Sequence, residues 1–446
     1  MKLKKFITAA SALCLIGTVS PSFFNNESFS ITANAAEILD SGYCHDIRYP
    51  EETSDFTYTY DSDGVLTISG NGDMYDFVAR NLTPWYKYKD DIKKIIIGEG
   101  ITSIGNRAFG FYEYCTEVSL PSTLKTVDEF YGFTSLKSIT LPEGLEDIDI
   151  QAFCDCDSLK TVTIPSTVKT IDAEAFGWCD SLLEIKVAPG NKNFIDVDGV
   201  LYTKDLTKLL QFPNGKPVTS YTIEPTVTTI GEGAFNNAEN LKEIILPVGL
   251  TTIEPSALSS TGIKTISIPS GVSVLNRSVF NSSQLQKVVI PENITKIDTF
   301  AFRNNKNLEK IIIKNPLCEI EDDGCTISSN LSSNVTFNGT IYGYTNSTAQ
   351  KYAEKYNYKF VSLDGLSKLG DVNFDNHADS DDASLVLAEY ARKATQKPLQ
   401  FSSQQNESAD VNFDGNIDSD DASLILSYYA YTAVGGTQSP EEFFSR

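Results

Sequence analysis

The chain is poor in the residues that much enzyme chemistry requires. Only two histidines, His45 and His377, occur in 446 residues, so catalysis by a histidine-based triad is close to excluded. The segment Gly70-Asn71-Gly72 lacks the third glycine and the following helix of a dinucleotide-binding fingerprint. Carboxylates are plentiful, but none stands in a recognisable glycosidase context. The sequence therefore predicts a protein that is not an enzyme.

Basic residues and long apolar runs are also scarce. Lysine and arginine number 36 against 59 acidic residues, which gives a formal net charge of -23. Nucleic-acid binding relies on basic surface that neutralises phosphate, and anionic membranes attract the same kind of surface. No stretch after the first few dozen residues is long and apolar enough to span a bilayer. We therefore expect neither a nucleic-acid partner nor membrane insertion.

The first 36 residues are typical of a secretory signal peptide. Lys2, Lys4 and Lys5 precede a short apolar stretch from Phe6 to Val19, and Ala33-Asn34-Ala35 offers a cleavage pattern. A membrane anchor is the rival interpretation, but the apolar stretch is short for a span. The mature protein is expected to be secreted and extracellular.

Cysteine is sparse and unevenly spaced. Of eight cysteines, Cys14 lies in the signal segment and seven remain, an odd number that forbids complete internal pairing. No spacing resembles a four-ligand zinc site. Most of the seven are expected to be small buried core residues, and a Cys318–Cys325 disulfide is left open.

One period dominates the body of the chain. Short apolar units end in proline, as in Val118-Ser119-Leu120-Pro121 and Val162-Thr163-Ile164-Pro165. After a first unit at Ile95-Ile96-Ile97, the second apolar position recurs at 120, 141, 164, 187, 223, 246, 268, 290 and 313. The spacings are 21 to 23 residues, apart from one of 36.

Each unit has a second element. Eleven residues after the second apolar position comes a small residue, usually followed by phenylalanine: Ala108-Phe109, Ala152-Phe153, Ala175-Phe176, Ala234-Phe235 and Ala301-Phe302. One such unit cannot bury its apolar face alone, whereas stacked units share a continuous core. The proline ends each strand because it lacks a backbone donor. The pattern predicts a β-rich solenoid with a parallel sheet and about ten rungs of 22 to 23 residues.

This pattern resembles the BspA-like leucine-rich repeats of bacterial surface proteins. By the same resemblance, residues 37–91 form an N-terminal β cap, 92–338 the solenoid, 189–217 a hairpin insert and 339–361 a closing cap. The insert accounts for the long spacing.

Two surface patches on this body are candidate contacts for a protein or glycan ligand, against the alternative of ordinary packing. The first gathers aromatic residues of early loops: Phe111, Tyr112, Tyr114, Tyr131, Phe133 and Trp178. The second gathers outward positions of late strands: Ile245, Val289 and Ile312.

The strongest chemical signal is a duplicated loop near the C-terminus. Positions 1, 3, 5, 7, 9 and 12 of the first copy are Asp371, Asn373, Asp375, His377, Asp379 and Asp382. Thirty-nine residues later the same positions are Asp410, Asn412, Asp414, Asn416, Asp418 and Asp421. Hard oxygen ligands at this spacing suit calcium in an EF-hand loop, with position 7 offering its backbone carbonyl. The pattern predicts two bound calcium ions.

The duplicated loop resembles the F-hand repeats of dockerins. Position 12 is aspartate rather than glutamate, and the run before each loop is short or polar. Each loop leads into an apolar helix, so a small all-α module is expected over 370–446, after a linker at 362–369. Dockerins bind cohesin modules of scaffold proteins. The resemblance assigns cohesin contacts to Ser380, Asp381, Leu385, Tyr390, Ser419, Asp420, Leu424 and Tyr428.

One departure concerns position 6, where dockerin loops usually have glycine for the sharp turn. The second loop has Gly415, but the first has Asn376. Asparagine tolerates the left-handed conformation, so we expect both loops to bind calcium.

Together these observations predict a non-catalytic secreted subunit of a cellulosome-type complex, held at the cell surface through a scaffold. Its repeat body is expected to bind an unknown protein or glycan. Two alternatives stay open: a glycoside hydrolase subunit of the same complex, and an adhesion protein displayed at the cell surface.

Overall fold

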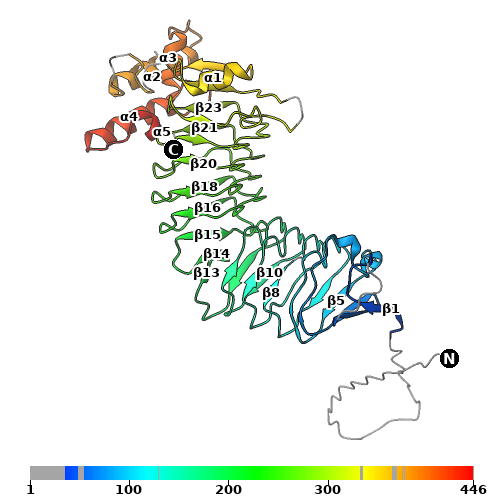
Figure 1. Cartoon of the computed structure of the whole chain (residues 1–446). Coiled ribbons are helices and arrows are strands. Elements are labelled where there is room, and N and C mark those ends of the chain that lie inside the picture. Colours follow the sequence, from blue (N-terminus) through cyan, green and yellow to red (C-terminus); the bar gives the residue numbers. More distant parts are fainter. Residues whose placement is uncertain are drawn as a thin grey trace, which may run out of the picture.

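The computed structural model describes residues 36–48, 55–128, 130–331, 335–363, 369–373, 375 and 377–444. The predicted signal peptide and most of the predicted linker lie outside these residues. Figure 1 shows a long stack of rungs with a group of helices beside its C-terminal end.

The first face of the stack is built from the strands of the repeated apolar units. It consists of β5 (Lys94–Ile97), β7 (Glu117–Ser119), β10 (Thr161–Ile164), β12 (Glu184–Val187), β16 (Ser220–Thr222), β18 (Glu243–Ile245), β21 (Lys287–Ile290) and β23 (Lys310–Ile313). β5 pairs in parallel with β7, β10 with β12, β16 with β18 and β21 with β23, and equivalent apolar residues lie side by side, as Val288 and Ile311 do. Parallel in-register pairing confirms the predicted solenoid.

The ladder continues into both caps. At one end β1 (Ile38–Tyr43), β2 (Thr57–Asp61) and β3 (Val65–Ser69) form an antiparallel sheet, and β3 pairs in parallel with β5. At the other end β23 is followed by β25 (Thr340–Gly343) and β26 (Lys359–Ser362), with α1 (Thr348–Lys355) between them. With these strands the solenoid has about 12 turns rather than ten.

A second face is made of very short strands. One group is β4 (Gly72–Asp73), β6 (Ile101–Ser103), β8 (Thr126–Val127), β9 (Asp147–Ile148) and β11 (Thr170–Ile171). The other comprises β15 (Lys208–Gln211), β17 (Thr229–Ile230) and β19 (Thr252–Ile253), followed by the separate sheet of β20 (Val274–Leu275), β22 (Lys296–Ile297) and β24 (Glu319–Ile320). Short 3-10 turns, η1 (Arg80–Leu82) and η2 (Tyr86–Tyr88), complete the N-terminal cap.

Two predicted strands do not form ladders. The units Ile139–Leu141 and Ile266–Ile268 have no strand assignment, yet their apolar side chains are buried. Packing therefore keeps these rungs in the stack without regular strand pairing.

The segments that contain the Ala-Phe pairs form a third side of the solenoid, beside its two strand faces. Phe109, Phe130, Phe153 and Phe176 stack with ring centroids 5.6 to 5.8 Å apart and nearly parallel planes. The residue directly before an Ala-Phe pair has a positive φ, as Gln151 does before Ala152-Phe153, with a φ of 56°. This left-handed turn directs the following pair into the core. Burying large rings in contact is a major source of the stack's stability.

The insert divides the body into two cores. β13 (Phe194–Val197) pairs antiparallel with β14 (Val200–Thr203), and β14 pairs antiparallel with β15. The buried apolar residues before and after this hairpin fall into two separate clusters that meet at Val200 and Leu201. Figure 1 shows the solenoid bending here, between β10 and β16.

Both predicted surface patches are partly wrong. In the first, Phe111, Tyr114 and Trp178 are exposed, but Tyr112 and Phe133 are fully buried and stack on each other at 5.7 Å. Tyr112 and Phe133 each lie three residues after a phenylalanine of the stack. The same positions in the next two rungs are the buried Cys156 and Cys179. In the second patch Ile245 is exposed, whereas Ile312 is only 8% exposed.

The cysteines carry no disulfide. All seven after the signal segment are free, and all but Cys325 are buried. The Cys318–Cys325 bond that the sequence left open is therefore absent. Burial raises the pKa of the Cys318 thiol to about 12, so this thiol is an inert core group rather than a reactive one.

The C-terminal module has its own small core. α2 (Ser380–Ala394) and α4 (Ser419–Ala433) pack against each other, and α3 (Ser403–Ala409) and α5 (Pro440–Phe444) complete the module. Val386 and Ile425 lie at its centre with Val372 and Val411 from the two loops. This core shares no residue with the solenoid cores.

Candidate calcium loops and dockerin face

Each loop folds around its last aspartate. Asp382 and Asp421 are completely buried. Asp421 Oδ1 accepts hydrogen bonds from the backbone N–H of Val411 (3.0 Å) and Asn412 (3.3 Å), and Oδ2 accepts one from Asp418 (3.1 Å). Asp382 accepts from Val372 at 2.7 Å, Asn373 at 2.9 Å and Asp379 at 3.0 Å. The duplicated sequence thus makes the same closed loop twice.

The other loop oxygens are aligned by the backbone. In the second loop Asn412 Oδ1 accepts from Asp414 N (2.9 Å), and Asp414 Oδ1 accepts from Asn416 N (2.7 Å). In the first loop Asn373 Oδ1 accepts from Asp375 N at 2.8 Å, and Asp375 Oδ1 accepts from His377 N at 2.8 Å. Such turns bring the side chains of alternate positions to one side of the loop.

Position 9 also begins the following helix. Asp379 and Asp418 are the N-caps of α2 and α4, and each forms a reciprocal capping box with the aspartate at position 12. The helix start and the loop end are therefore one hydrogen-bonded unit.

The donor set suits a calcium ion. Asp410 Oδ1 is buried and has no hydrogen-bond partner among the described residues, which is costly for a carboxylate unless a cation lies beside it. Burial raises the pKa of Asp421 to about 6 and also raises the pKa of Asp410 and Asp382. A divalent cation would hold these carboxylates ionised.

No ready-made cluster of charged ligands is present. Among the described residues, no three Asp, Glu, His or Cys side chains converge as a metal site. The predicted ligands also include asparagine side chains and a backbone carbonyl, which belong to an EF-hand set. His377 is exposed, and its Nδ1 lies 3.3 Å from Asp375 Oδ1, so the imidazole is not needed as a ligand.

The predicted cohesin contacts divide into two groups. Ser380, Asp381, Ser419 and Asp420 are exposed at the helix starts, as are Leu385 and Tyr390 on α2. Leu424 is partly buried.

Tyr428 lies in the module core rather than on its surface. It is 8% exposed, and its ring centroid lies 5.3 Å from Phe443 and 5.4 Å from Phe444. The two copies of the loop and helix are 39 residues apart in the sequence. Tyr390 in the first copy therefore corresponds to Tyr429 in the second, which is exposed, and Tyr428 corresponds to the buried Glu389. Counting this offset could have found Tyr429 from the sequence. Tyr429 is the residue that the geometry favours for a surface contact.

The second loop lies against the end of the solenoid. The Nζ atoms of Lys287 on β21 and Lys310 on β23 lie 2.6 and 5.3 Å from the ring centroid of Phe413. Phe413 has a positive φ of 62°. Burial, with Lys310 nearby, lowers the pKa of Lys287 to about 6. The module and the solenoid therefore touch where the Phe413 ring lies against Lys287 and Lys310.

Replacing Phe413 with alanine should expose the two lysines in the full chain. We expect Lys287 and Lys310 to be acylated severalfold faster by an amine-reactive reagent, measured by mass spectrometry of peptides. Tyr429→Ala removes an exposed ring of the same module and should leave both rates unchanged. Equal rates in the wild-type protein and the Phe413→Ala variant would show that the ring does not cover these lysines.

Comparison with known proteins identifies both parts of the chain. Residues 84–198 and 211–332 match the BspA-type leucine-rich-repeat region in six copies, and residues 369–428 match the dockerin type I domain. No curated protein matches the chain closely enough to count as a relative. Among the described residues, none of the helices has the length and apolar character needed to cross a membrane.

A solved structure agrees with the repeat fold. A leucine-rich-repeat protein from Eubacterium ventriosum is 27% identical, with a TM-score of 0.52, and the match covers 60% of this chain and 78% of that one. A leucine-rich cell surface protein from Faecalibacterium prausnitzii is 20% identical, with a TM-score of 0.40, and the match covers 66% of this chain and 99% of that one. The chain belongs to the BspA-type leucine-rich-repeat family and carries a C-terminal dockerin type I domain.

Proposed function

We propose that this protein is a non-catalytic, exported subunit that docks through its dockerin onto a cohesin-bearing scaffold of a polysaccharide-degrading complex. The observation that carries the proposal is the duplicated loop closed by the buried Asp382 and Asp421. Dockerin domains bind cohesin modules, and leucine-rich repeats and dockerin domains are both non-catalytic module types. The repeat body is the part that binds a second ligand, a protein or a glycan.

Each loop holds one calcium ion in this proposal. The ligands are the side chains at positions 1, 3, 5, 9 and 12 and the backbone carbonyl of position 7. When bound, calcium neutralises the clustered carboxylates. The capping boxes position α2 and α4. The exposed residues at the N-terminal ends of these two helices contact the cohesin.

Titration calorimetry of the full chain against a panel of cohesins tests the proposal. Tight binding in calcium that disappears with chelator is the expected result. A protein that binds two calcium ions but no cohesin would contradict docking and would favour the adhesion function.

The two halves of the module predict a dual binding mode. Ser380-Asp381 and Ser419-Asp420 are identical in sequence and equally exposed. Replacing Ser380 and Asp381 with alanine should therefore leave the affinity for cohesin within a few fold of wild type, because the second half still binds. The fourfold variant that also changes Ser419 and Asp420 should lose binding. Complete loss in the double variant alone would contradict two modes.

A further inference from the structure

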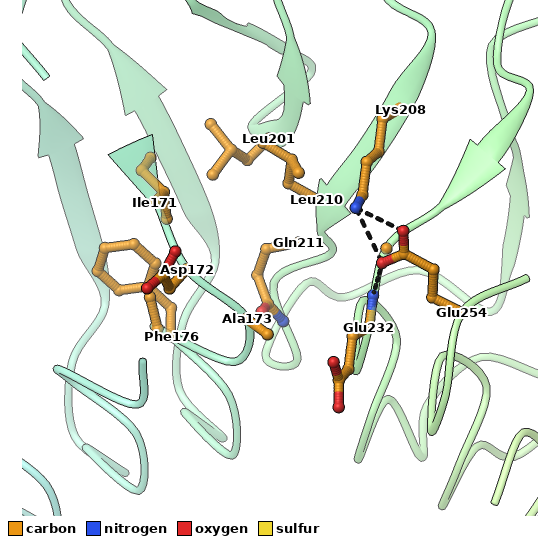
Figure 2. Close-up of a pocket in the computed structure, with 12 residues that line it drawn as sticks. Ile171, Asp172, Ala173, Phe176, Leu201, Lys208, Leu210, Gln211, Glu232 and Glu254 are labelled. Carbon is orange, nitrogen blue, oxygen red and sulfur yellow. Dashed lines mark hydrogen bonds and ion pairs between the residues drawn. The ribbon is translucent and has the colours of Figure 1, made fainter. Parts of the chain in front are cut away.

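A cavity opens where the solenoid bends. The second-face sheet of the first half ends at β11, and β15, the last strand of the insert, belongs to the next sheet. Between these strands lies a cavity with a volume of about 270 Å³, here called the bend pocket (Figure 2). It is lined by residues of both halves, from Ile171 to Glu254.

The inner wall of the bend pocket is apolar. Ile171 and Phe176 come from the first half, and Leu201 and Leu210 come from the insert. Figure 2 shows Leu201 and Leu210 between Ile171 and Lys208. No aromatic plane is offered to a ligand, because Phe176 is only 1% exposed.

The rim of the bend pocket is acidic. Asp172, Glu232 and Glu254 line it together with one cation, Lys208, so the formal charge of the lining is -2. Lys208 Nζ is already held by Glu254, at 2.7 and 2.8 Å from its two carboxylate oxygens. The pKa of Asp172 is raised by burial and by the neighbouring Asp149, as expected where negative charge lacks compensation.

Two uncharged acceptors face the same space. Gln211 is only 3% exposed, and its Nε2 donates to the Phe212 carbonyl at 3.1 Å. Its Oε1 accepts no hydrogen bond from the described residues. Gln211 is therefore a buried side chain on the pocket lining with acceptor capacity to spare.

The second acceptor is a carbonyl at the end of a ladder. The carbonyls of Val127 and Ile148 accept from the N–H groups of Asp149 and Asp172 in the next rung, both at 3.0 Å. The equivalent carbonyl of Ile171 receives no backbone donor from the described residues, because β15 pairs with β14 and β17 and not with β11. Such an open strand edge is a ready pairing site.

We infer that the bend pocket binds a basic side chain, lysine or arginine, of an extended segment of a partner protein. The aliphatic stem lies on the apolar wall, and the cationic head donates to the acidic rim, Gln211 Oε1 and the Ile171 carbonyl. Arginine suits several acceptors because it has five donors in a fixed plane. A neutral sugar lacks the aromatic plane it usually stacks on, and an anion is repelled.

This inference deepens the second half of the proposed function by naming the class of ligand for the repeat body. It rests on the body being a binding module, and it is independent of cohesin docking. Its test must therefore report on the bend pocket and on the dockerin separately.

The test is fluorescence anisotropy of the full chain with a labelled peptide, acetyl-Gly-Arg-Gly-Arg-Gly-amide. A matching peptide has citrulline in place of arginine and so keeps the shape without the charge. We expect the arginine peptide to bind and the citrulline peptide to bind at least roughly tenfold more weakly, a difference of about 1.4 kcal/mol. The Asp172→Asn, Glu232→Gln double variant should weaken the arginine peptide by a similar factor.

Glu239→Gln removes an exposed acid outside the bend pocket and should leave peptide binding unchanged. Equal binding of the two peptides, no binding of either, or no effect of the double variant overturns the inference. Cohesin titration of the same variants separates the two functions. Retained cohesin binding without peptide binding refutes only the pocket, whereas the reverse result refutes only the docking proposal.

Discussion

Replacing Asp421 with alanine is expected to remove calcium from the second loop and to unfold most of the dockerin domain. The buried carboxylate accepts three backbone hydrogen bonds, and alanine leaves those donors unpaired at a cost of about 1–3 kcal/mol each. Small modules have little stability beyond such a loss. Calorimetry should show at most one bound calcium ion, and helical circular dichroism should fall even in calcium.

The matched control is Asp420→Ala. Asp420 is the neighbouring residue and is exposed, so this variant removes the same charge without touching the loop hydrogen bonds. It should bind two calcium ions and keep its helices. Two calcium ions bound by the Asp421→Ala variant would refute the role given to position 12.

The second large effect is expected from Phe153→Ala in the solenoid. The Phe153 ring is fully buried between Phe130 and Phe176, with centroid distances of 5.8 and 5.6 Å. Removing a ring from such a stack costs about 3–5 kcal/mol. Because each rung contacts only its neighbours, loss of the Phe153 ring should weaken the contact between the rungs on either side, so that they no longer unfold together. Urea denaturation should show a clearly lower midpoint or an added intermediate.

Trp178→Ala provides the comparison. Trp178 is a larger aromatic residue of the next rung, but its side chain is exposed. We expect its unfolding midpoint to stay close to that of the wild-type protein. Equal destabilisation by the two variants would show that the phenylalanine stack does not hold the first core together.

The periodic parts of the fold were predictable because every rung must bury the same positions. The spacing identified most of the strands and the Ala-Phe elements, and the family resemblance identified the insert. Phe130 was missed because it lies two positions before the place that the repeat predicts for the phenylalanine of its rung, which has the short spacing of 21 residues. The backbone hydrogen bonds show that Phe130 is nevertheless equivalent to the other stacked phenylalanines. Phe130 N donates to Ala152 O at 2.7 Å, as Phe153 N does to Ala175 O at 2.8 Å.

The folding of the two loops was predictable for a different reason. The candidate calcium ligands of each loop lie within twelve consecutive residues, so local backbone turns alone bring their oxygens together. It was harder to predict from the sequence which side chains of α2 and α4 are buried and which are exposed. Tyr428 and Tyr429 are adjacent and chemically identical, and only α5, through Phe443 and Phe444, selects which ring is covered.

By itself, the sequence determined the repeat, the family and the duplicated loop, because these depend on short-range spacing. Only the tertiary structure decided the burial of Tyr112 and Phe133, the division into two cores, the contact of Phe413 with Lys287, and the bend pocket. Each of these results from contacts between residues far apart in the chain, where packing against a neighbouring rung or module overrides what a side chain prefers alone.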